Sequence, residues 1–422
     1  MNVIEKPSRS EADMLGERIR EIRKRKKMTL EALAGEELTK GMLSLIENNK
    51  AKPSMESLTY IAKRLDVDIT ELLEDISTQK LRELLAEAEK LFNSDSHKTA
   101  NQYQQLTGLI EPYVQNLSQG YESARLLDIY SRSLYYQQTH GWKELSVKAA
   151  NMYDDMNLTA RRANIGLFWA MSRFVEHHYQ DALQILLQER SQIEAKHHFI
   201  DAMTRVDFDY HEAILHFAVG DSEAAAAVME KAIQFSNEEG IFYRIYDLYR
   251  LAAAHAMMTG NNQQQQYYML KLKQYSEFAE DKQARSFYDL FQTIALISLE
   301  QDYQKALQII DAYLANAETN DDDRSWYLHE KGKALYCLGQ YNEALQCLEK
   351  VEISAYIHHP FDLSMLYIKD AYKALCQMEL GFQAEALDAA ATAVENFAAM
   401  PPTPYKDFAT KTYQAIQLRT RS

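Results

Sequence analysis

The stretch that decides the fold of the N-terminal part of the chain is Leu38-Thr39-Lys40-Gly41-Met42-Leu43-Ser44-Leu45-Ile46-Glu47-Asn48-Asn49-Lys50-Ala51-Lys52-Pro53-Ser54. Its spacing predicts one short helix, with Thr39 as the N-cap and with Leu43 and Ile46 on the inward side. The residues that then share the outward face, three or four positions apart, are Lys40, Gly41, Ser44, Leu45 and Asn48.

Other short helices flank this stretch on both sides, between Leu15 and Leu73. Apolar residues at helical spacing predict that the following side chains turn inward: Leu15, Ile19, Ile22, Ala32, Leu33, Leu58, Ile61 and Leu65. Thr29 can cap the second helix, Pro53 and Ser54 begin the fourth, and a last helix starts at about Thr70. Because Gly35 lies where such a unit must bend, we predict a helix-turn-helix domain over residues 15–75, after a flexible arm of residues 1–14.

The quoted stretch resembles the signature of Xre/Cro-type repressors, which reads roughly V-S-x-x-x-I-S-x-I-E-x-G-K-x-x-P-S. The apolar, hydroxyl, Glu, Lys, Pro and Ser positions are all in register, and the resemblance extends from Leu15 to Leu73. Asn49 stands where the signature has Gly, a mild departure because Asn tolerates the left-handed conformation. Glu47 is interpreted as structural and paired with an arginine of the first helix such as Arg23.

The resemblance implies that the outward face of the recognition helix binds double-stranded DNA. Lys40 and Ser44 can reach a base edge or a phosphate, whereas Leu45 offers only apolar contact, for example to a thymine methyl group. Lys50 and Lys52, in the loop after the helix, suit phosphates. The DNA-binding residues we expect are Thr39, Lys40, Gly41, Ser44, Leu45, Asn48, Lys50 and Lys52.

The charge distribution agrees with this assignment. The chain has 422 residues and a net charge of -15, but residues 17–65 carry 12 basic against 7 acidic residues. The rest of the chain carries 34 basic against 54 acidic residues. A basic head on an acidic body is typical of DNA binding by the head, although a solvated basic helix would give the same pattern.

The remainder of the chain is predicted to be helical, because only 13 Gly and 7 Pro interrupt 422 residues, and its sequence repeats. In each copy a Gly-like turn position stands five residues before a small residue of the second helix, as Gly339 stands before Ala344. The small-residue positions are Ser146, Ala182, Ala225, Gln265, Ala306, Ala344 and Ala386, at spacings of 36, 43, 40, 41, 38 and 42, and Gln265 breaks the rule. We predict an all-α chain: the helix-turn-helix domain, a linker helix over 76–93, and a right-handed superhelical array over 94–422 that resembles tetratricopeptide repeats.

Arrays of this kind bind extended peptides on a concave wall made by their first helices. The repeat register places six residues where they can face that wall: Arg125, Asn164, Tyr210, Arg250, Phe291 and His329. An asparagine can satisfy a peptide N–H and C=O together, and an arginine can hold a carboxylate. Each of the six can equally be a packing or surface residue.

An Xre-type head followed by such repeats resembles the RRNPP group of peptide-sensing regulators, and its NprR-type members most closely. The resemblance implies a cytoplasmic homodimer that binds a short signalling peptide and thereby changes its promoter binding in quorum sensing. For NprR-type members it also implies binding to a response regulator of the sporulation phosphorelay. The alternative is that the array is a protein–protein adaptor, for example for such a response regulator, without a peptide ligand.

Other classes of function find no support in the sequence. No stretch of about 20 apolar residues predicts a membrane span, and residues 1–14 lack the apolar centre of a signal peptide. The adjacent pairs His177-His178, His197-His198 and His358-His359 diverge on a helix, so we expect no metal site. With no phosphate-binding Gly loop and no nucleophile elbow, we expect neither a cofactor nor an enzyme.

Overall fold

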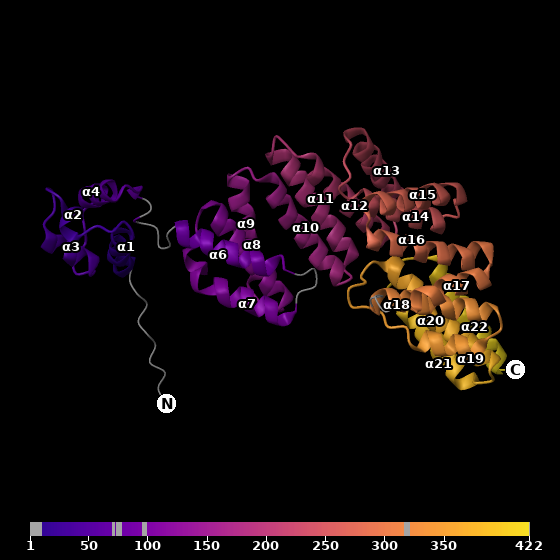
Figure 1. The fold of residues 1–422 in the computed structure, drawn as a ribbon. Helices are drawn as coiled ribbons and strands as arrows, with labels where there is room; N and C mark the ends of the chain where they lie inside the picture. The colour runs from indigo at the N-terminus through magenta and orange to yellow at the C-terminus, as the bar shows by residue number, and fades with distance from the viewer. Residues whose placement is uncertain (1–10, 70–71, 73–77, 95–98, 316–320, 422) are drawn as a thin grey trace, which may run out of the picture. The chain divides into compact units, whose positions relative to one another are not determined.

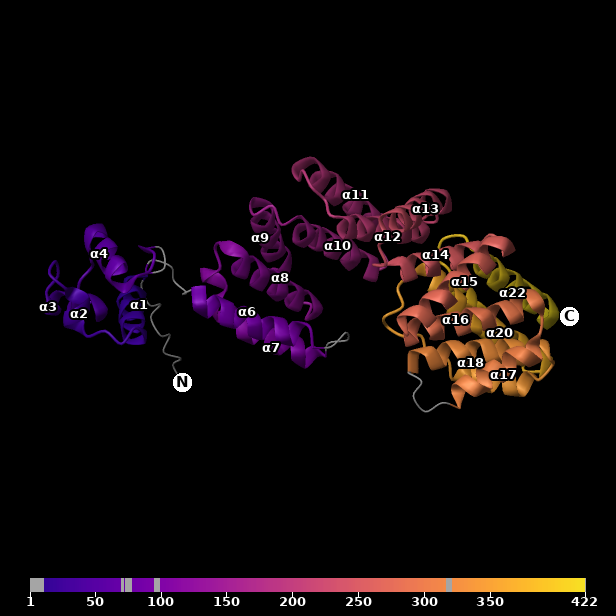
Figure 2. The same ribbon diagram turned by 45° about the horizontal axis from the view of Figure 1, so that its top comes forward.

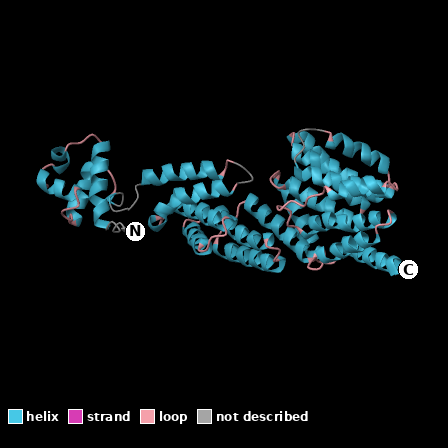
Figure 3. Ribbon diagram, turned by 90° about the horizontal axis from the view of Figure 1, so that it is seen from below, coloured by secondary structure: helices cyan, strands magenta, loops and turns pink. Residues whose placement is uncertain are grey.

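The computed structural model describes residues 11–69, 72, 78–94, 99–315 and 321–421. Every regular element in this part of the chain is a helix, as the sequence predicted, and no strand occurs in it (Figure 3). The chain divides into two compact units, Met1–Arg162 and Ala163–Ser422, and the boundary falls within helix α10 (Thr159–Val175).

The N-terminal end of the first unit is the predicted group of short helices (Figure 1). Its helices are α1 (Glu11–Arg25), α2 (Leu30–Ala34), α3 (Lys40–Glu47) and α4 (Met55–Leu65). The first helix begins at Glu11, four residues earlier than predicted, since neither Gly nor Pro interrupts residues 11–15. Residues 1–10 of the predicted arm lie outside the described residues, and so does most of the predicted last helix from Thr70.

The predicted caps begin these helices. The hydroxyl oxygens of Thr29, Thr39 and Ser54 accept hydrogen bonds from backbone N–H groups three residues on, at 3.0, 3.1 and 3.2 Å. Gly35 ends α2 with a positive φ of 58°, so the chain can bend there toward α3.

A single apolar core holds the four helices together. Its buried members are Ile19, Ile22, Leu33, Ala34, Leu43, Ile46, Leu58, Ile61, Ala62, Leu65 and Leu72. The predicted inward positions are confirmed except at α2, where Ala34 is buried and Ala32 is exposed. That helix has only five residues, so one turn does not fix which alanine faces the core.

The rest of the first unit consists of helical pairs. They are α6 (Thr78–Phe92) with α7 (Ala100–Ile110), a 3-10 turn η1 (Glu111–Asn116), and α8 (Gly120–Tyr136) with α9 (Trp142–Asp155). The predicted linker helix is α6, and it packs against both α7 and α8. The predicted linker helix is therefore packed together with the first hairpins.

The second unit continues the series of hairpins. They are α10 with α11 (Tyr179–Lys196), α12 (Ala202–Val219) with α13 (Ser222–Glu239), α14 (Ile245–Met258) with α15 (Asn262–Ala279), α16 (Lys282–Ala295) and the π-helical turn η2 (Leu296–Glu300) with α17 (Tyr303–Leu314), α18 (Asp321–Cys337) with α19 (Tyr341–Glu349), and α20 (Pro360–Glu379) with α21 (Gln383–Asn396). The last helix, α22 (Pro404–Arg421), packs on α20 and α21. Several first helices of neighbouring hairpins pack against each other, namely α12 with α14, α16 with α18, and α18 with α20 (Figures 1 and 2).

The repeat signature is confirmed at each of the seven predicted copies. The small-residue position of every second helix is buried, with an exposed fraction of 0% at six positions and 5% at Gln265. The residue five positions earlier has a positive φ in every copy: Gly141, His177, Gly220, Gly260, Gln301, Gly339 and Gly381. A left-handed residue therefore reverses the chain before each second helix, even where the sequence has no glycine.

The second unit also closes on itself in a way that the repeat pattern does not predict. The Tyr179 hydroxyl donates to the carbonyl oxygen of His358 at 2.9 Å, across 179 residues of sequence. His359 Nε2 lies 3.3 Å from the carbonyl oxygen of Ile214. The start of α20 is thus fixed against α11 and α12.

Candidate DNA interface and ligand pocket

Helix α3 presents the outward face that its spacing predicted. Leu43 and Ile46 are buried in the head core, whereas Lys40, Gly41, Leu45 and Asn48 are exposed, and Ser44 is half-buried. Thr39 is exposed as the N-cap, and Lys50 and Lys52 are exposed in the loop after the helix. Seven of the eight predicted DNA-binding residues are therefore exposed on or next to α3, and Ser44 is half-buried.

A buried ion pair anchors the end of α3 to α1. Arg23 Nε and Nη2 donate to the two carboxylate oxygens of Glu47 at 2.6 and 2.8 Å. Arg23 Nη1 also donates to the carbonyl oxygen of Met28 at 2.8 Å. The hydrogen bond that Arg23 donates to Glu47 is the main reason why the pKa of Arg23 is raised, although burial opposes this shift. The predicted structural role of Glu47 is confirmed.

Asn49 and Gly16 make a second connection between the same helices. Asn49 has a φ of 56°, as its place in the signature predicted, and its Oδ1 accepts from the N–H of Gly16 at 2.9 Å. A Cβ atom on Gly16 would lie 2.1 Å from the carbonyl oxygen of Ile46. Sequence reasoning missed Gly16, because its requirement arises from contact with a segment about 30 residues away.

Two of the predicted contact residues already have partners within the head. Lys40 forms an ion pair with Glu31, and this contact is the main cause of the lowered pKa of Glu31. Asn48 Nδ2 donates to the carbonyl oxygen of Ser44 at 2.7 Å. Both interactions are exposed, so DNA can replace them at little cost.

Two apolar side chains lie on the same face as these polar groups. Leu45 is 46% exposed and Met42, which sequence reasoning did not select, is 48% exposed. They stand three residues apart on α3 and can offer apolar contacts to thymine methyl groups.

The six predicted wall residues all lie on first helices, namely α8, α10, α12, α14, α16 and α18. Their exposure differs sharply. Asn164 is exposed and Arg250 is half-buried, whereas the buried members are Arg125, Tyr210, Phe291 and His329. The register is therefore as predicted, but it does not make every position accessible.

Arg125 is the centre of a structural ion pair. Its guanidinium donates to both carboxylate oxygens of Glu89, at 2.6 and 3.2 Å, and to Asp128 at 2.7 Å. Burial by itself would lower the pKa of Arg125, but the hydrogen bond that it donates to Glu89 and the charge of Asp128 raise it. Its predicted role as a carboxylate clamp is corrected, because two protein carboxylates already fill the fork of the guanidinium.

His329 is also buried and does not face an open wall of the array. Its side chain is 0% exposed, and its Nδ1 lies 3.2 Å from Glu330, which also accepts from Lys333 at 2.9 Å. Burial lowers the pKa of His329. The reason is that α18 packs against α17, α19 and α20, so more than one of its faces is covered.

The second unit brings three of the predicted residues together. The Arg250 guanidinium lies 5.3 Å from the centre of the Phe287 ring, and the Phe287 and Phe291 rings are 4.3 Å apart. Burial would lower the pKa of Arg250, but Tyr210 and Tyr246, followed by Asp362 and Asp247, raise it. Helices α12, α14, α16 and α20 thus meet around one half-buried cation.

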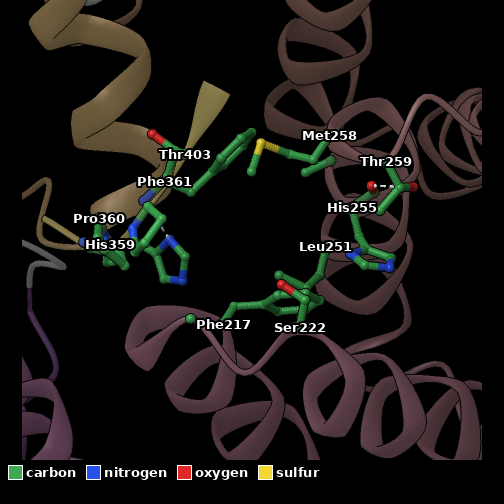
Figure 4. A pocket seen from close by; sticks show the side chains of 14 residues that line it. Phe217, Ser222, Leu251, His255, Met258, Thr259, His359, Pro360, Phe361 and Thr403 are labelled. Carbon is green, nitrogen blue, oxygen red and sulfur yellow. Dashed lines mark hydrogen bonds between the residues drawn. The ribbon is translucent and has the colours of Figure 1, made fainter. Parts of the chain in front are cut away.

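The second unit also contains a cavity of about 230 Å³ (Figure 4). Its lining comes from α12, the start of α13, α14, the start of α20 and the loop before α22: Phe217, Gly220, Ser222, Leu251, Ala254, His255, Met258, Thr259, His359, Pro360, Phe361, Pro401, Pro402 and Thr403. In Figure 4 the Phe361 ring and the Met258 side chain point toward one another, with Phe217 below Leu251. Sequence reasoning missed this cavity, because the residues at the start of α20 that line it are 100 or more residues away from those of α12 and α14.

One histidine joins two walls of the cavity. His359 Nδ1 accepts from the N–H of Phe361 at 3.2 Å as the N-cap of α20, so its Nε2 carries the hydrogen that faces the carbonyl oxygen of Ile214. Burial and then the charge of Arg250 hold the pKa of His359 below its usual value, while Asp362 opposes them. The neutral imidazole therefore connects α12 to α20.

Among the described residues no helix is long and apolar enough to cross a membrane. The same part of the chain contains no group of three or more His, Cys, Asp or Glu side chains arranged to hold a metal ion.

The head and the repeats together define the class of the protein: an N-terminal helix-turn-helix domain followed by an array of helical hairpins. Residues 16–76 match the family model of a helix-turn-helix domain. No curated protein matches the chain.

The chain is similar to several solved structures. PlcR of Bacillus thuringiensis, in complex with the peptide PapR7 and DNA, is 18% identical over 71% of this chain and 95% of that chain, with a TM-score of 0.30. Apo ComR of S. thermophilus is 19% identical over 55% and 97%, with a TM-score of 0.27. The pheromone receptor Rgg2 of Streptococcus dysgalactiae is 14% identical over 65% and 98%, with a TM-score of 0.31. Because these TM-scores lie below 0.5, we base the function on the residues of this chain.

Proposed function

We propose that this protein is a cytoplasmic transcription regulator of the RRNPP type. Its head binds double-stranded DNA, and its hairpin array binds a short signalling peptide that changes the geometry of a homodimer and its promoter binding. The observation that carries the DNA-binding part is the face of α3, which is accessible outside and anchored inside by the Arg23–Glu47 pair. Such an arrangement holds a recognition helix rigid against its domain.

The DNA-binding part is tested with a duplex that the wild-type chain selects from a random library. If Lys40 and Ser44 contact base edges, Lys40→Ala and Ser44→Ala weaken binding to that duplex by about 1–3 kcal/mol each. If Lys50 contacts a phosphate, Lys50→Ala weakens binding to all sequences alike and reduces the salt slope by about one unit. Lys148→Ala, at an exposed site on α9, is the matched control. Failure of all three head variants to alter binding would contradict the assignment of α3.

A dimer is part of the proposal, because one helix-turn-helix covers few base pairs. Two heads on one duplex require half-sites whose centres lie about 34 Å apart or a multiple of that distance. Footprinting on the selected duplex would show this spacing. Protection of a single half-site by a monomer in sedimentation would contradict it.

For the peptide we propose the first-helix side of the second unit, where Asn164 is exposed and Arg250 is half-buried. The asparagine amide can hold a peptide backbone, and the guanidinium can hold a carboxylate. Calorimetry with short peptides secreted by the source organism tests this. Asn164→Ala and Arg250→Ala should reduce the affinity for the active peptide and keep basal DNA binding, and unchanged affinity in both variants would contradict the placement.

The adaptor alternative differs in its ligand. A response regulator of a sporulation phosphorelay, as in NprR-type members, would bind the array without any peptide. We favour the peptide, because the exposed Asn164 amide and the half-buried Arg250 guanidinium suit the backbone and the carboxylate of a short peptide.

A further inference from the structure

Helix α15 differs from the other second helices of the array in the side chains that it exposes. Its residues Tyr267, Leu270 and Phe278 are 52%, 52% and 79% exposed. Of the other second helices, α9 and α11 expose one large apolar residue each, and α7, α13, α17, α19 and α21 expose none among their described residues. A group of exposed apolar side chains on one of several similar helices indicates an interaction surface.

The exposed residues of α15 form one continuous stripe. Positions 267, 270, 274 and 278 are three or four residues apart, so they share one face of the helix. The buried residues lie on the opposite face: Gln265, Leu272 and Ser276. Phe242, in the loop before α14, is 67% exposed, and its ring centre lies 6.1 Å from that of Phe278. The loop therefore extends the stripe beyond the helix.

The charges along one edge of this stripe suit a second copy of the same helix. Lys273 and Glu277 are one turn apart, and their side chains are 43% and 56% exposed. Lys273 Nζ lies 3.9 Å from Glu277 Oε1, at the outer limit of an ion pair. In an antiparallel helix pair with a two-fold axis, the same edge of each helix meets with reversed direction. Glu277 of each copy therefore comes beside Lys273 of the other.

We propose that two copies of this chain form a homodimer through the stripe, with their α15 helices antiparallel. Gln274 is exposed in the middle of the stripe. A two-fold axis at Gln274 places Leu270 of one copy in the same layer as Phe278 of the other. Both the apolar layer and the charge pair occur twice in such a dimer. This inference rests on the homodimer of the proposed function and assigns a surface to it.

A second copy explains the stripe better than an unrelated protein, because its apolar and charged positions complement themselves. The contact of one helix pair is smaller than the usual interface of about 1,200–2,000 Å², so we expect a dissociation constant on the order of micromolar. A duplex with two half-sites would strengthen the dimer by raising the effective concentration of the second copy.

The first test measures the dimer dissociation constant of the full-length protein by sedimentation. Leu270→Glu and Phe278→Glu should each raise this constant at least about a hundredfold, because a dimer would bury two unpaired carboxylates. Both side chains are exposed in the single chain, so neither change should disturb the fold. Leu187→Glu is the matched control, since Leu187 is the exposed apolar residue of α11, and it should dimerise like the wild type.

The second test reverses the charges. Lys273→Glu and Glu277→Lys should each weaken the dimer at least about threefold, because like charges then meet twice across the axis. The double variant restores opposite charges on both sides and should recover most of the wild-type affinity. A double variant as weak as the two single variants would contradict the antiparallel arrangement.

The third test uses a cysteine on the proposed axis, in a Cys337→Ser background because Cys337 is exposed. Two copies of residue 274 face each other across the axis, so Gln274→Cys should give a disulfide-linked dimer under mild oxidation. Asp388→Cys, at an exposed position on α21, is the control and should stay largely uncrosslinked.

Two results would overturn the inference in distinguishable ways. If the wild type is a dimer and Leu270→Glu and Phe278→Glu dimerise equally well, the stripe is not the interface, while the homodimer of the proposed function stands. If the wild type stays monomeric, both alone and on the selected duplex, the inference falls together with that homodimer. The stripe would then belong to a contact with a different protein, and DNA binding by the head would be unaffected.

Discussion

Replacement of Glu47 by alanine should destabilise the helix-turn-helix domain more than any exposed substitution on α3. Glu47 is 3% exposed and holds both Nε and Nη2 of Arg23, at 2.6 and 2.8 Å. Removal of one partner from a buried ion pair leaves the other charge without compensation, which costs about 3–5 kcal/mol. Since a domain is stable by only about 5–15 kcal/mol, this loss is a large fraction of the total.

Two further variants separate charge from shape. Glu47→Gln keeps the side chain's size and one oxygen acceptor, so we expect a smaller loss, about 1–3 kcal/mol. The double variant Arg23→Met with Glu47→Leu leaves no unpaired charge and should recover most of the stability. It still loses the hydrogen bond from Arg23 to the carbonyl oxygen of Met28, worth about 1 kcal/mol.

Hydrogen exchange with mass spectrometry on the full-length protein measures these effects locally. The amides of α1 and α3 report the opening free energy of the head separately from that of the array. Glu21→Gln, an exposed carboxylate on α1, is the control and should change that free energy by less than about 0.5 kcal/mol. A loss in Glu47→Ala no larger than in this control would refute the structural role that we assign to the pair.

Three more predictions concern the backbone and His359. Gly16→Ala should destabilise the head by about 2 kcal/mol or more in the same exchange experiment, because its Cβ would meet the carbonyl oxygen of Ile46 at 2.1 Å; wild-type protection would show that this contact is easily relieved. Gln301→Gly should stabilise the array by up to about 1 kcal/mol, because Gln301 has a positive φ of 55° that glycine adopts more easily. Gly381→Ala should destabilise the array by a similar amount, because Gly381 has a φ of 88°. Urea unfolding measures both, and a less stable Gln301→Gly variant together with a more stable Gly381→Ala variant would show that the turn conformation does not decide stability. Burial lowers the pKa of His359 in the folded chain. At pH values below the unfolded-state pKa of about 6.5, the unfolded chain therefore binds more protons than the folded chain. The free energy of unfolding should be at its full value above that pH and should decline as the pH falls through the lower folded-state pKa. His359→Gln should reduce this decline in unfolding free energy, and an unchanged pH dependence would exclude His359 as a source of it.

Much of the fold follows from residues that are close together in the sequence. The inward stripe of α3, its cap at Thr39 and the left-handed Asn49 are set by spacing and by local backbone chemistry. The hairpins follow in the same way, because a left-handed turn residue and a small buried residue five positions later fix where two helices reverse and touch. Even the Arg23–Glu47 pair was predicted, since both residues lie in one short domain with few alternative partners.

Only the tertiary structure decided which faces of the repeat helices are accessible. Helical periodicity shows which residues share a face, but it does not show how many neighbours cover that face. For this reason Arg125 and His329, predicted on an open wall, are buried among charged partners, while Asn164 is exposed. The cavity lined by α12, α14 and the start of α20 exists because the start of α20 returns to α12 across 145 residues of sequence, a contact that depends on the packing of every hairpin between them.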